Sequence, residues 1–285
     1  SLLRNKVESR IIKFINIMTK KERVYLTELY YFALSFFVYG FLGWCTEVAY
    51  AAAKQGKFVN RGFLNGPICP VYGIGVGVVV QFLTPIENNL VLLYISSTIL
   101  VTVIEGLTGF LLEKIFHNKW WDYSEQPLNI GGYVCVLFSL IWGVFCVLIV
   151  KVIHPLIDKV LTMIPFVLGI VVMVCLAAGL LADLYVTASG ILKMNRRLEA
   201  MEKIAAELKE LSDKVGENIY ENVMEGMEFR EEKKARMEEL KAKYEEMAEN
   251  RTKVGERLVK AFPKMQVRQH KEIFEELRER IKRSK

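Results

Sequence analysis

The sequence predicts an all-α membrane protein. We expect a polytopic helical membrane domain of four or five spans, one of them a candidate re-entrant segment, with a C-terminal helical coiled-coil tail. The chain is 52% hydrophobic and 25% charged, and the charge is concentrated near one end. Residues 193–285 hold 24 of the 38 Lys and Arg and 21 of the 32 Asp and Glu. The two parts of the chain therefore suit different solvents, lipid for the first and water for the second.

The composition also excludes several classes of function. Basic and acidic residues interleave along the tail, so no surface of one sign is available and we expect no nucleic-acid partner. The five cysteines lie in apolar stretches and none has C-x-x-C spacing. We therefore expect neither a disulfide framework nor a metal site, and no cofactor.

The first 29 residues form a basic arm with seven Lys and Arg. Their apolar residues recur at helical spacing, which is typical of an amphipathic helix lying at the membrane surface. A helix packed on the protein's own cytoplasmic face is the alternative.

The predicted transmembrane domain, residues 30–192, contains five apolar segments close to the roughly 20 residues that a span needs. The second segment combines two prolines with three alternating glycines, which is unfavourable for a straight helix. The five segments are 30–53, 68–84, 90–113, 131–153 and 165–192.

The distribution of Lys and Arg bears on whether the number of membrane spans is odd or even. Basic residues flank both ends of the domain, so both ends look cytoplasmic by the positive-inside rule. Five full spans cannot place both ends on one side. We favour a re-entrant segment 68–84, which protein or a water-filled cavity would have to cover. The alternative is five spans with the basic arm outside.

Three acids lie inside predicted spans: Glu47, Glu105 and Asp183. An ionised carboxylate at the bilayer centre costs about 2.5–3.5 kcal/mol on insertion scales, so each must face protein or water. Each acid also shares a helix face with small or polar residues three or four positions away. These stripes are either helix–helix contacts or the lining of a polar site, and for the acids we favour the polar site.

The segments beside the spans supply further candidates for a pocket or an interface. Asn60 and Arg61 precede the Gly/Pro-rich segment, and Arg61 is a candidate counter-charge for one of the acids. Trp120, Trp121, Asp122 and Tyr123 follow the third span. Aromatic residues at this position are typical of a membrane-interface belt, with a lid or headgroup contact as the alternative.

Several runs together resemble one family over about residues 30–190. The most specific is Phe58–Gly73, which reads FVNRGFLNGPICPVYG. The others are Gly40–Trp44 with Glu47, Glu105–Gly109, and Trp120–Tyr123. Together they resemble the CmpB family of type IV ABC-transporter permeases, a bacterial group of integral membrane proteins.

This resemblance implies a multi-pass plasma-membrane protein that acts as a transporter permease. The chain has no G-x-x-x-x-G-K-[ST] phosphate loop, so an ATPase would have to be a separate subunit. We find no acid–base or metal constellation and expect that the chain is not an enzyme. A lipid-acting enzyme that uses Glu47, Arg61 and Asp122 ranks last.

The tail shows two runs of apolar residues with alternating steps of three and four, at 198–219 and 237–258. This spacing predicts a coiled coil over residues 193–262, and the tail is expected to be cytoplasmic. The two runs are out of phase by one residue, which fits either a continuous rod or an antiparallel hairpin. Self-association or a coiled-coil partner through 198–258 would then be expected. A short amphipathic helix follows in 263–285.

The sequence favours two functions for this protein. The first is a transport component with an interior polar site formed by Glu47, Glu105 and Asp183. The second is a membrane-anchored scaffold or sensor that acts through its cytoplasmic coiled coil.

Overall fold

The computed structural model describes residues 20–221 and 226–283. Most of the predicted interfacial arm lies outside these residues, and 20–29 form the start of the first long helix. The chain divides into two compact units. Unit 1 comprises residues up to Leu111 together with Asp122–Tyr185, and unit 2 comprises Leu112–Trp121 and Val186–Lys285.

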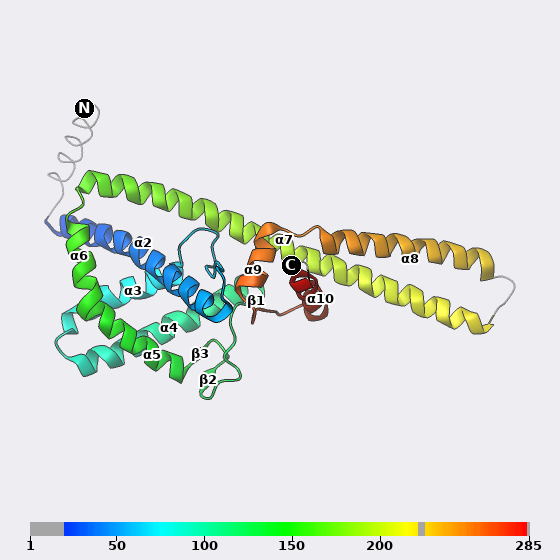
Figure 1. Ribbon diagram of the computed structural model, residues 1–285, viewed down its shortest axis with the longest axis horizontal. Coiled ribbons are helices and arrows are strands. Elements are labelled where there is room, and N and C mark those ends of the chain that lie inside the picture. The colour runs from blue at the N-terminus through cyan, green and yellow to red at the C-terminus, as the bar shows by residue number, and fades with distance from the viewer. Residues whose placement is uncertain (1–19, 222–225, 284–285) are drawn as a thin grey trace, which may run out of the picture. The chain divides into compact units, whose positions relative to one another are not determined.

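The described residues are almost entirely helical, which confirms the predicted all-α class (Figure 1). Four helical stretches are long and apolar enough to cross a membrane: Val24–Gln55, Leu90–Phe116, Val136–Thr162 and Phe166–Lys214. Many of their Leu, Ile, Val and Phe side chains are exposed. Such a surface suits lipid and would be unfavourable in water. The protein is therefore a polytopic membrane protein.

Unit 1 is built from helices joined by short connections. Its elements are α2 (Lys20–Gln55), α3 (Pro70–Leu83), the 3₁₀ turn η1 (Thr84–Ile86), α4 (Leu90–Phe116), β2 (Asn129–Ile130), β3 (Val134–Cys135), α5 (Val136–Leu148), the π-helical turn η2 (Ile149–Ile153), α6 (His154–Thr162) and the first part of α7 (Phe166–Glu221). Strands β2 and β3 form a small antiparallel hairpin before α5.

Contacts along α3 show that α2 and α4 run in the same direction. Gly43 of α2 faces Tyr72 at the start of α3, and Phe32 faces Gly77. At the end of α3, Leu83 packs against Leu93 near the start of α4. Helix α3 is therefore antiparallel to both neighbours. The chain between α2 and α4 passes from one end of unit 1 to the other.

The later helices continue this alternation. Gly143 of α5 faces Thr98 of α4, and α5 with α6 returns to the end where α2 begins, where Leu161 packs against Tyr30. Helix α7 starts there, beside Tyr30, and runs back. Five passes result, and α2 begins at the opposite end of unit 1 from the point where α7 leaves it.

The second pass is only partly helical. Residues 56–69 carry no regular structure, yet the Cys69 amide already donates to the carbonyl of Gly40 at 2.9 Å. That contact lies 15 residues before the end of α2, or about 22 Å along its axis. Helix α3 has 14 residues and covers about 21 Å. The Gly/Pro-rich segment thus crosses as an extended loop plus a short helix. This arrangement matches the five-pass alternative, and the re-entrant alternative that we favoured from the sequence does not describe it.

Glycines allow α3 to approach α2 closely. A Cβ atom at Gly43 would lie 2.4 Å from the Cβ and Cγ of Tyr72, and one at Gly73 would lie 2.5 Å from the Phe36 carbonyl oxygen. Close approach of this kind is what small residues provide at helix contacts in membranes. Part of the predicted small-residue stripe on α2 therefore serves helix packing.

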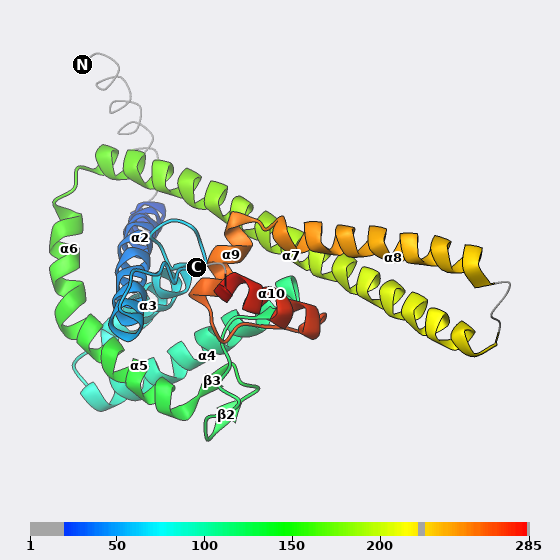
Figure 2. The same ribbon diagram turned by 45° about the vertical axis from the view of Figure 1, so that its right-hand side comes forward.

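Unit 2 contains an antiparallel helical hairpin (Figures 1 and 2). The part of α7 after residue 185 pairs with α8 (Gly226–Glu249). Leu198 and Met201 of α7 and Leu240 of α8 are buried. Arg236 bridges to Glu207 across the pair at 3.1 Å. Of the two arrangements left open by the sequence, the structure has the hairpin.

The second apolar run of the tail does not continue as one helix. Helix α8 ends at Glu249, and α9 (Lys253–Ala261) starts after a break, where the Thr252 hydroxyl accepts from the Gly255 amide at 3.2 Å. A hydroxyl at this N-cap position satisfies a helix-end amide and so fixes the start of α9. Strand β4 (Gln266–Val267) and α10 (Lys271–Arg283) complete unit 2.

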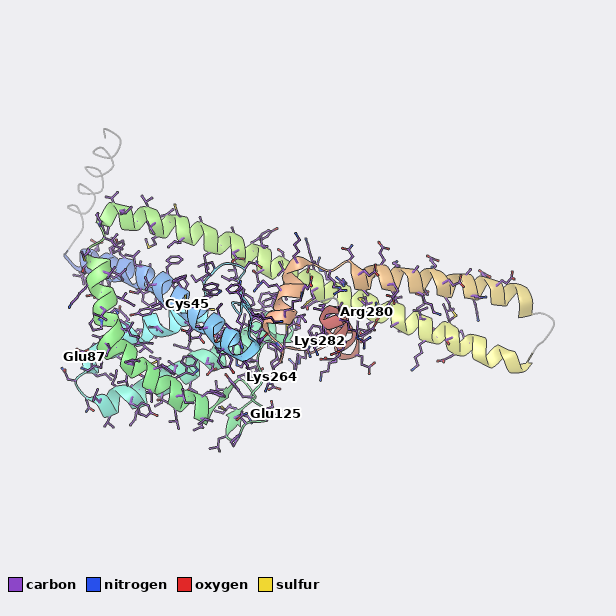
Figure 3. All side chains as sticks on the ribbon, in the orientation of Figure 1. Cys45, Glu87, Glu125, Lys264, Arg280 and Lys282 are labelled. Carbon is purple, nitrogen blue, oxygen red and sulfur yellow. The ribbon has the colours of Figure 1, made fainter. Side chains whose placement is uncertain are left out.

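Residues 112–121, which lie within the predicted transmembrane domain 30–192, belong to unit 2. Strand β1 (Asn118–Lys119) pairs antiparallel with β4, and the Asn195 amide donates to the Phe116 carbonyl at 2.6 Å. Arg280 and Lys282 of α10 lie in the same unit (Figure 3). The tail is therefore a small folded unit that includes the end of α4.

Candidate functional site

Glu47 of α2 is held by two partners from the second pass. The Arg61 Nε lies 3.1 Å from Glu47 Oε2, and the Tyr72 hydroxyl donates to Glu47 Oε1 at 2.7 Å. The Arg61 side chain is 23% exposed and that of Glu47 is 26% exposed. Because both side chains are largely shielded from water, salt screens this ion pair less than it screens an exposed pair. Arg61 is thus the counter-charge of Glu47.

Glu105 of α4 is bonded to a residue of the following loop. The Tyr123 hydroxyl donates to Glu105 Oε1 at 3.2 Å, and the Tyr123 ring stacks on Phe138 at 5.1 Å. Burial, the charge and hydrogen bond of Glu105, and more weakly the charge of Glu47 raise the pKa of Tyr123. The phenol therefore stays protonated and lies within electrostatic reach of both carboxylates.

We name Glu47, Arg61, Tyr72, Glu105 and Tyr123 the Glu47 cluster. Its members come from two long helices, the non-helical part of the second pass, the start of α3 and the loop after α4. The Trp142 ring of α5 packs edge-on against Tyr72, with ring centroids 5.6 Å apart. The cluster thus combines two acids with one guanidinium and two phenol hydroxyls, a set that can bind a polar or charged group and exchange protons.

Asp183 of α7 has a different setting. Its carboxylate accepts from the Asn65 amide at 3.1 Å, from the Asn65 side chain at 2.7 Å and from the Gly66 amide at 2.6 Å. Three donors offset much of the cost of placing this charge away from water. Asp183 therefore anchors the loop that leads into α3.

Asn60 organises the same loop. Its side-chain oxygen accepts from Trp44 Nε1 at 2.8 Å and from the Gly62 amide at 3.0 Å, and its amide group donates to the Asn65 carbonyl at 2.8 Å. These bonds satisfy backbone groups that the loop leaves outside any helix. Asn60 thus positions the segment that carries Arg61.

The four residues predicted as one aromatic interface divide between the two units. Trp120 is buried and packs edge-on against Phe262 of unit 2, with centroids 5.4 Å apart. Trp121 is half-buried in the same unit. Asp122 accepts from the Ser124 amide at 3.0 Å and from its hydroxyl at 2.6 Å, so it closes a local turn. Only Tyr123 joins the acids.

Two contributors were not found from the sequence. Tyr72 lies in the Gly/Pro-rich segment between Pro70 and Gly73, and no spacing rule links it to Glu47. Asn65 precedes Gly66 in a loop whose path only the tertiary structure defines. A polar side chain inside an otherwise apolar segment was the available signal for Tyr72.

Comparison with known proteins bears on the same part of the chain. A family model described as "Putative ABC-transporter type IV" matches residues 34–188, more than half of the chain. The match includes the whole Glu47 cluster, Asn60 and Asp183. Comparisons with curated proteins and with solved structures found no match. The chain belongs to this ABC-transporter family, the CmpB family, and is a membrane-embedded, transport-related protein.

Proposed function

We propose that this protein is the permease component of a transport system and that the Glu47 cluster is its interior polar site. The observation that carries the proposal is the Glu47–Arg61 pair with Tyr72, built against a second pass that is half extended chain. Exposed backbone at membrane depth is tolerated only where it lines a cavity or is covered by protein. Broken segments beside charged groups are typical of transporter binding sites.

Energy for transport would come from a separate ATPase subunit, because the chain carries no phosphate loop. The permease itself is then no enzyme and needs no cofactor. We place it in the plasma membrane of a bacterium, as the family resemblance implies.

We place the unit 2 tail in the cytoplasm. The connection 56–69, at the end of unit 1 where α7 leaves, carries Lys57 and Arg61, and Lys54 precedes it. The connections at the other end, 84–89 and 163–165, carry no Lys or Arg, although Lys20, Lys21 and Arg23 at the start of α2 lie at that end too. Short cytoplasmic connections are enriched in these residues.

The direct test is purification of the tagged full chain from its own membranes in mild detergent, with identification of co-purifying proteins. An ATPase in fixed stoichiometry is expected. Recovery of the protein alone, or only with a soluble partner that lacks an ATPase, would contradict the permease assignment.

The role of the cluster is tested in that complex. Glu47→Gln and Glu105→Gln are expected to lower its ATPase turnover at least tenfold while membrane insertion and complex assembly are retained. Glu125→Gln, an exposed acid in the loop that also carries Tyr123, is the control and should keep wild-type turnover. Unchanged turnover in both cluster variants would remove the cluster from the mechanism, and failure of both to accumulate would assign it to folding.

The second candidate function is a membrane-anchored scaffold or sensor. Helix α7 runs without a break from Phe166 to Glu221, and so connects a predicted span with the tail hairpin. Deletion of 198–285 separates the two functions. A permease should retain part of its activity, whereas a scaffold should lose all of it.

A further inference from the structure

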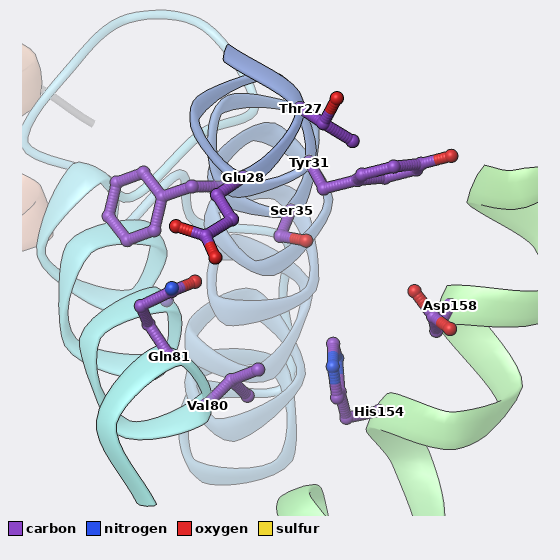
Figure 4. A pocket seen from close by; sticks show the side chains of 10 residues that line it. Thr27, Glu28, Tyr31, Ser35, Val80, Gln81, His154 and Asp158 are labelled. Atoms are coloured by element: carbon purple, nitrogen blue, oxygen red, sulfur yellow. The ribbon is translucent and has the colours of Figure 1, made fainter. Parts of the chain in front are cut away.

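A second polar region lies near the start of α2, well separated from the Glu47 cluster. It is a cavity of about 190 Å³ between α2, α3 and α6 (Figure 4). Its polar lining includes Glu28, Tyr31 and Ser35 of α2, Gln81 of α3, and His154 and Asp158 of α6. Glu28 precedes Glu47 by 19 residues, or about 28 Å along the helix. We name this feature the Ser35 cavity.

Ser35 indicates that the cavity suits a polar ligand. Its side chain lines the cavity (Figure 4), and the residue is only 6% exposed. Within residues 20–221 and 226–283, its hydroxyl has no hydrogen-bond partner. The hydroxyl is therefore available to a group that enters the cavity. A ligand atom in the cavity can form a hydrogen bond with it.

The charges around the cavity favour a cation. Among the residues that the structure describes, neither Glu28 nor Asp158 forms an ion pair, and no Lys or Arg lines the cavity. The His154 Nδ1 is engaged with the Tyr39 hydroxyl at 2.9 Å. Tyr31 and Phe32 also line the cavity, and aromatic rings attract cations over their faces. At the same end of unit 1, Lys151 lies 3.9 Å from Glu87, so these two charges offset each other.

The arrangement suits an organic cation better than a metal ion. Metal ions need several ligand atoms within about 2.0–2.6 Å. In the described part of the chain, no three His, Cys, Asp or Glu side chains come close enough together to hold a metal ion. An ammonium group on a short carbon chain can reach more widely spaced acceptors. The volume also fits, since engineered cavities of ~150 Å³ accept a ligand the size of benzene.

We propose that the Ser35 cavity binds a small primary ammonium group. Glu28 and Asp158 supply the negative charge, and Ser35 and Gln81 accept hydrogen bonds from the ammonium N–H groups. The ammonium can be carried by a soluble amine or by the headgroup of an aminophospholipid. This proposal does not rest on the permease assignment, because it concerns binding alone and a different end of unit 1.

Ethanolamine is a suitable probe, with choline for comparison. Binding is measured by titration calorimetry on the full chain in nanodiscs of phosphatidylcholine. Ethanolamine should bind saturably and at least tenfold more tightly than choline, because a quaternary ammonium has no N–H to donate to Ser35. The double variant Glu28→Gln/Asp158→Asn should weaken binding at least tenfold, and Ser35→Ala several-fold. Glu87→Gln, an acid at the same end that does not line the cavity, should bind as wild type.

A lipid arm identifies the source of the ammonium. The protein is reconstituted into nanodiscs of mixed phosphatidylethanolamine and phosphatidylcholine. Native mass spectrometry then measures the lipid that stays bound to the protein. Retained phosphatidylethanolamine that ethanolamine displaces supports a headgroup site. Ethanolamine binding without lipid retention supports a soluble amine.

Two results would overturn the proposal. One is the absence of both ethanolamine binding and phosphatidylethanolamine retention by the wild-type protein. The other is equal affinity of the wild type and the double variant. Glu28 and Asp158 are exposed, so their amide variants should fold, and size-exclusion chromatography checks this. If the double variant does not fold, the single variants Glu28→Gln and Ser35→Ala replace it. Ethanolamine affinities equal to that of the wild type would then overturn the proposal.

Discussion

The three acids of the membrane domain differ in what surrounds them. Glu47 has a guanidinium and a phenol, and Glu105 has a phenol. Asp183 has three donors from one loop. The sequence identified all three as acids that need partners, and it identified Arg61 as a counter-charge. It could not assign the partners, because each lies on another segment whose path depends on packing.

At the scale of single residues, loss of the Asp183 carboxylate should destabilise unit 1. Asp183→Ala leaves the amides of Asn65 and Gly66 without this acceptor, and we expect a cost of about 1–3 kcal/mol. The measurement is thermal unfolding of the purified protein in detergent. Asp213→Ala, an exposed aspartate on the same helix, is the control, and equal melting temperatures of the two variants would disprove the anchoring role.

A methyl group at Gly43 should also be destabilising. Because its Cβ would lie 2.4 Å from Tyr72, Gly43→Ala forces α2 and α3 apart, at a cost of about 1–3 kcal/mol. Gly179→Ala is the matched control, since nothing lies within 4 Å of a Cβ at that position. The stabilities of the two variants are compared by their melting temperatures in detergent. A loss of stability in Gly179→Ala as large as that in Gly43→Ala would contradict this packing argument.

At the scale of elements, the C-terminal helix is tied to the tail hairpin by charge. Arg280 of α10 lies 2.5 Å from Glu245 of α8 and 2.8 Å from Glu276 of its own helix. The Arg280 hydrogen bond lowers the pKa of Glu245, and burial first, then the bond from Tyr244 to Glu276, raise the pKa of Tyr244. These groups fix α10 to α8 in addition to the burial of Ile273, Phe274, Leu277 and Ile281.

The Arg280–Glu245 link predicts a pH dependence of the tail. A lowered carboxyl pKa stabilises the fold above the unfolded value of about 4.3 and loses that effect as pH falls through the folded value. The wild type should therefore lose more stability between pH 5 and 3 than Arg280→Gln does. Thermal melts followed by circular dichroism across this range test it, with Lys271→Gln, a change at an exposed lysine at the start of α10, as the control. Parallel pH profiles for wild type and Arg280→Gln would contradict the role of the link.

At the scale of the whole molecule, the five passes of unit 1 predict a membrane topology. Single cysteines in a cysteine-free background, labelled by an impermeant reagent, should place residues 60, 122 and 195 on one side. Residues 29, 87 and 163 should be labelled from the other side. Labelling of 29 and 195 from the same side would restore the re-entrant arrangement of 68–84.

The sequence by itself determined the fold class, the family and the acids that need partners. These follow from composition, from apolar runs and from the cost of charge in lipid, all of which act along the chain. The tertiary structure decided the path of the second pass, because residues 56–69 have no periodicity to read and are held by Asn60 and Asp183. It also joined residues 112–121 to the tail through β1 and β4. Pairing between segments more than a hundred residues apart depends on packing in three dimensions. The spacing of residues along the chain carries no information about such contacts.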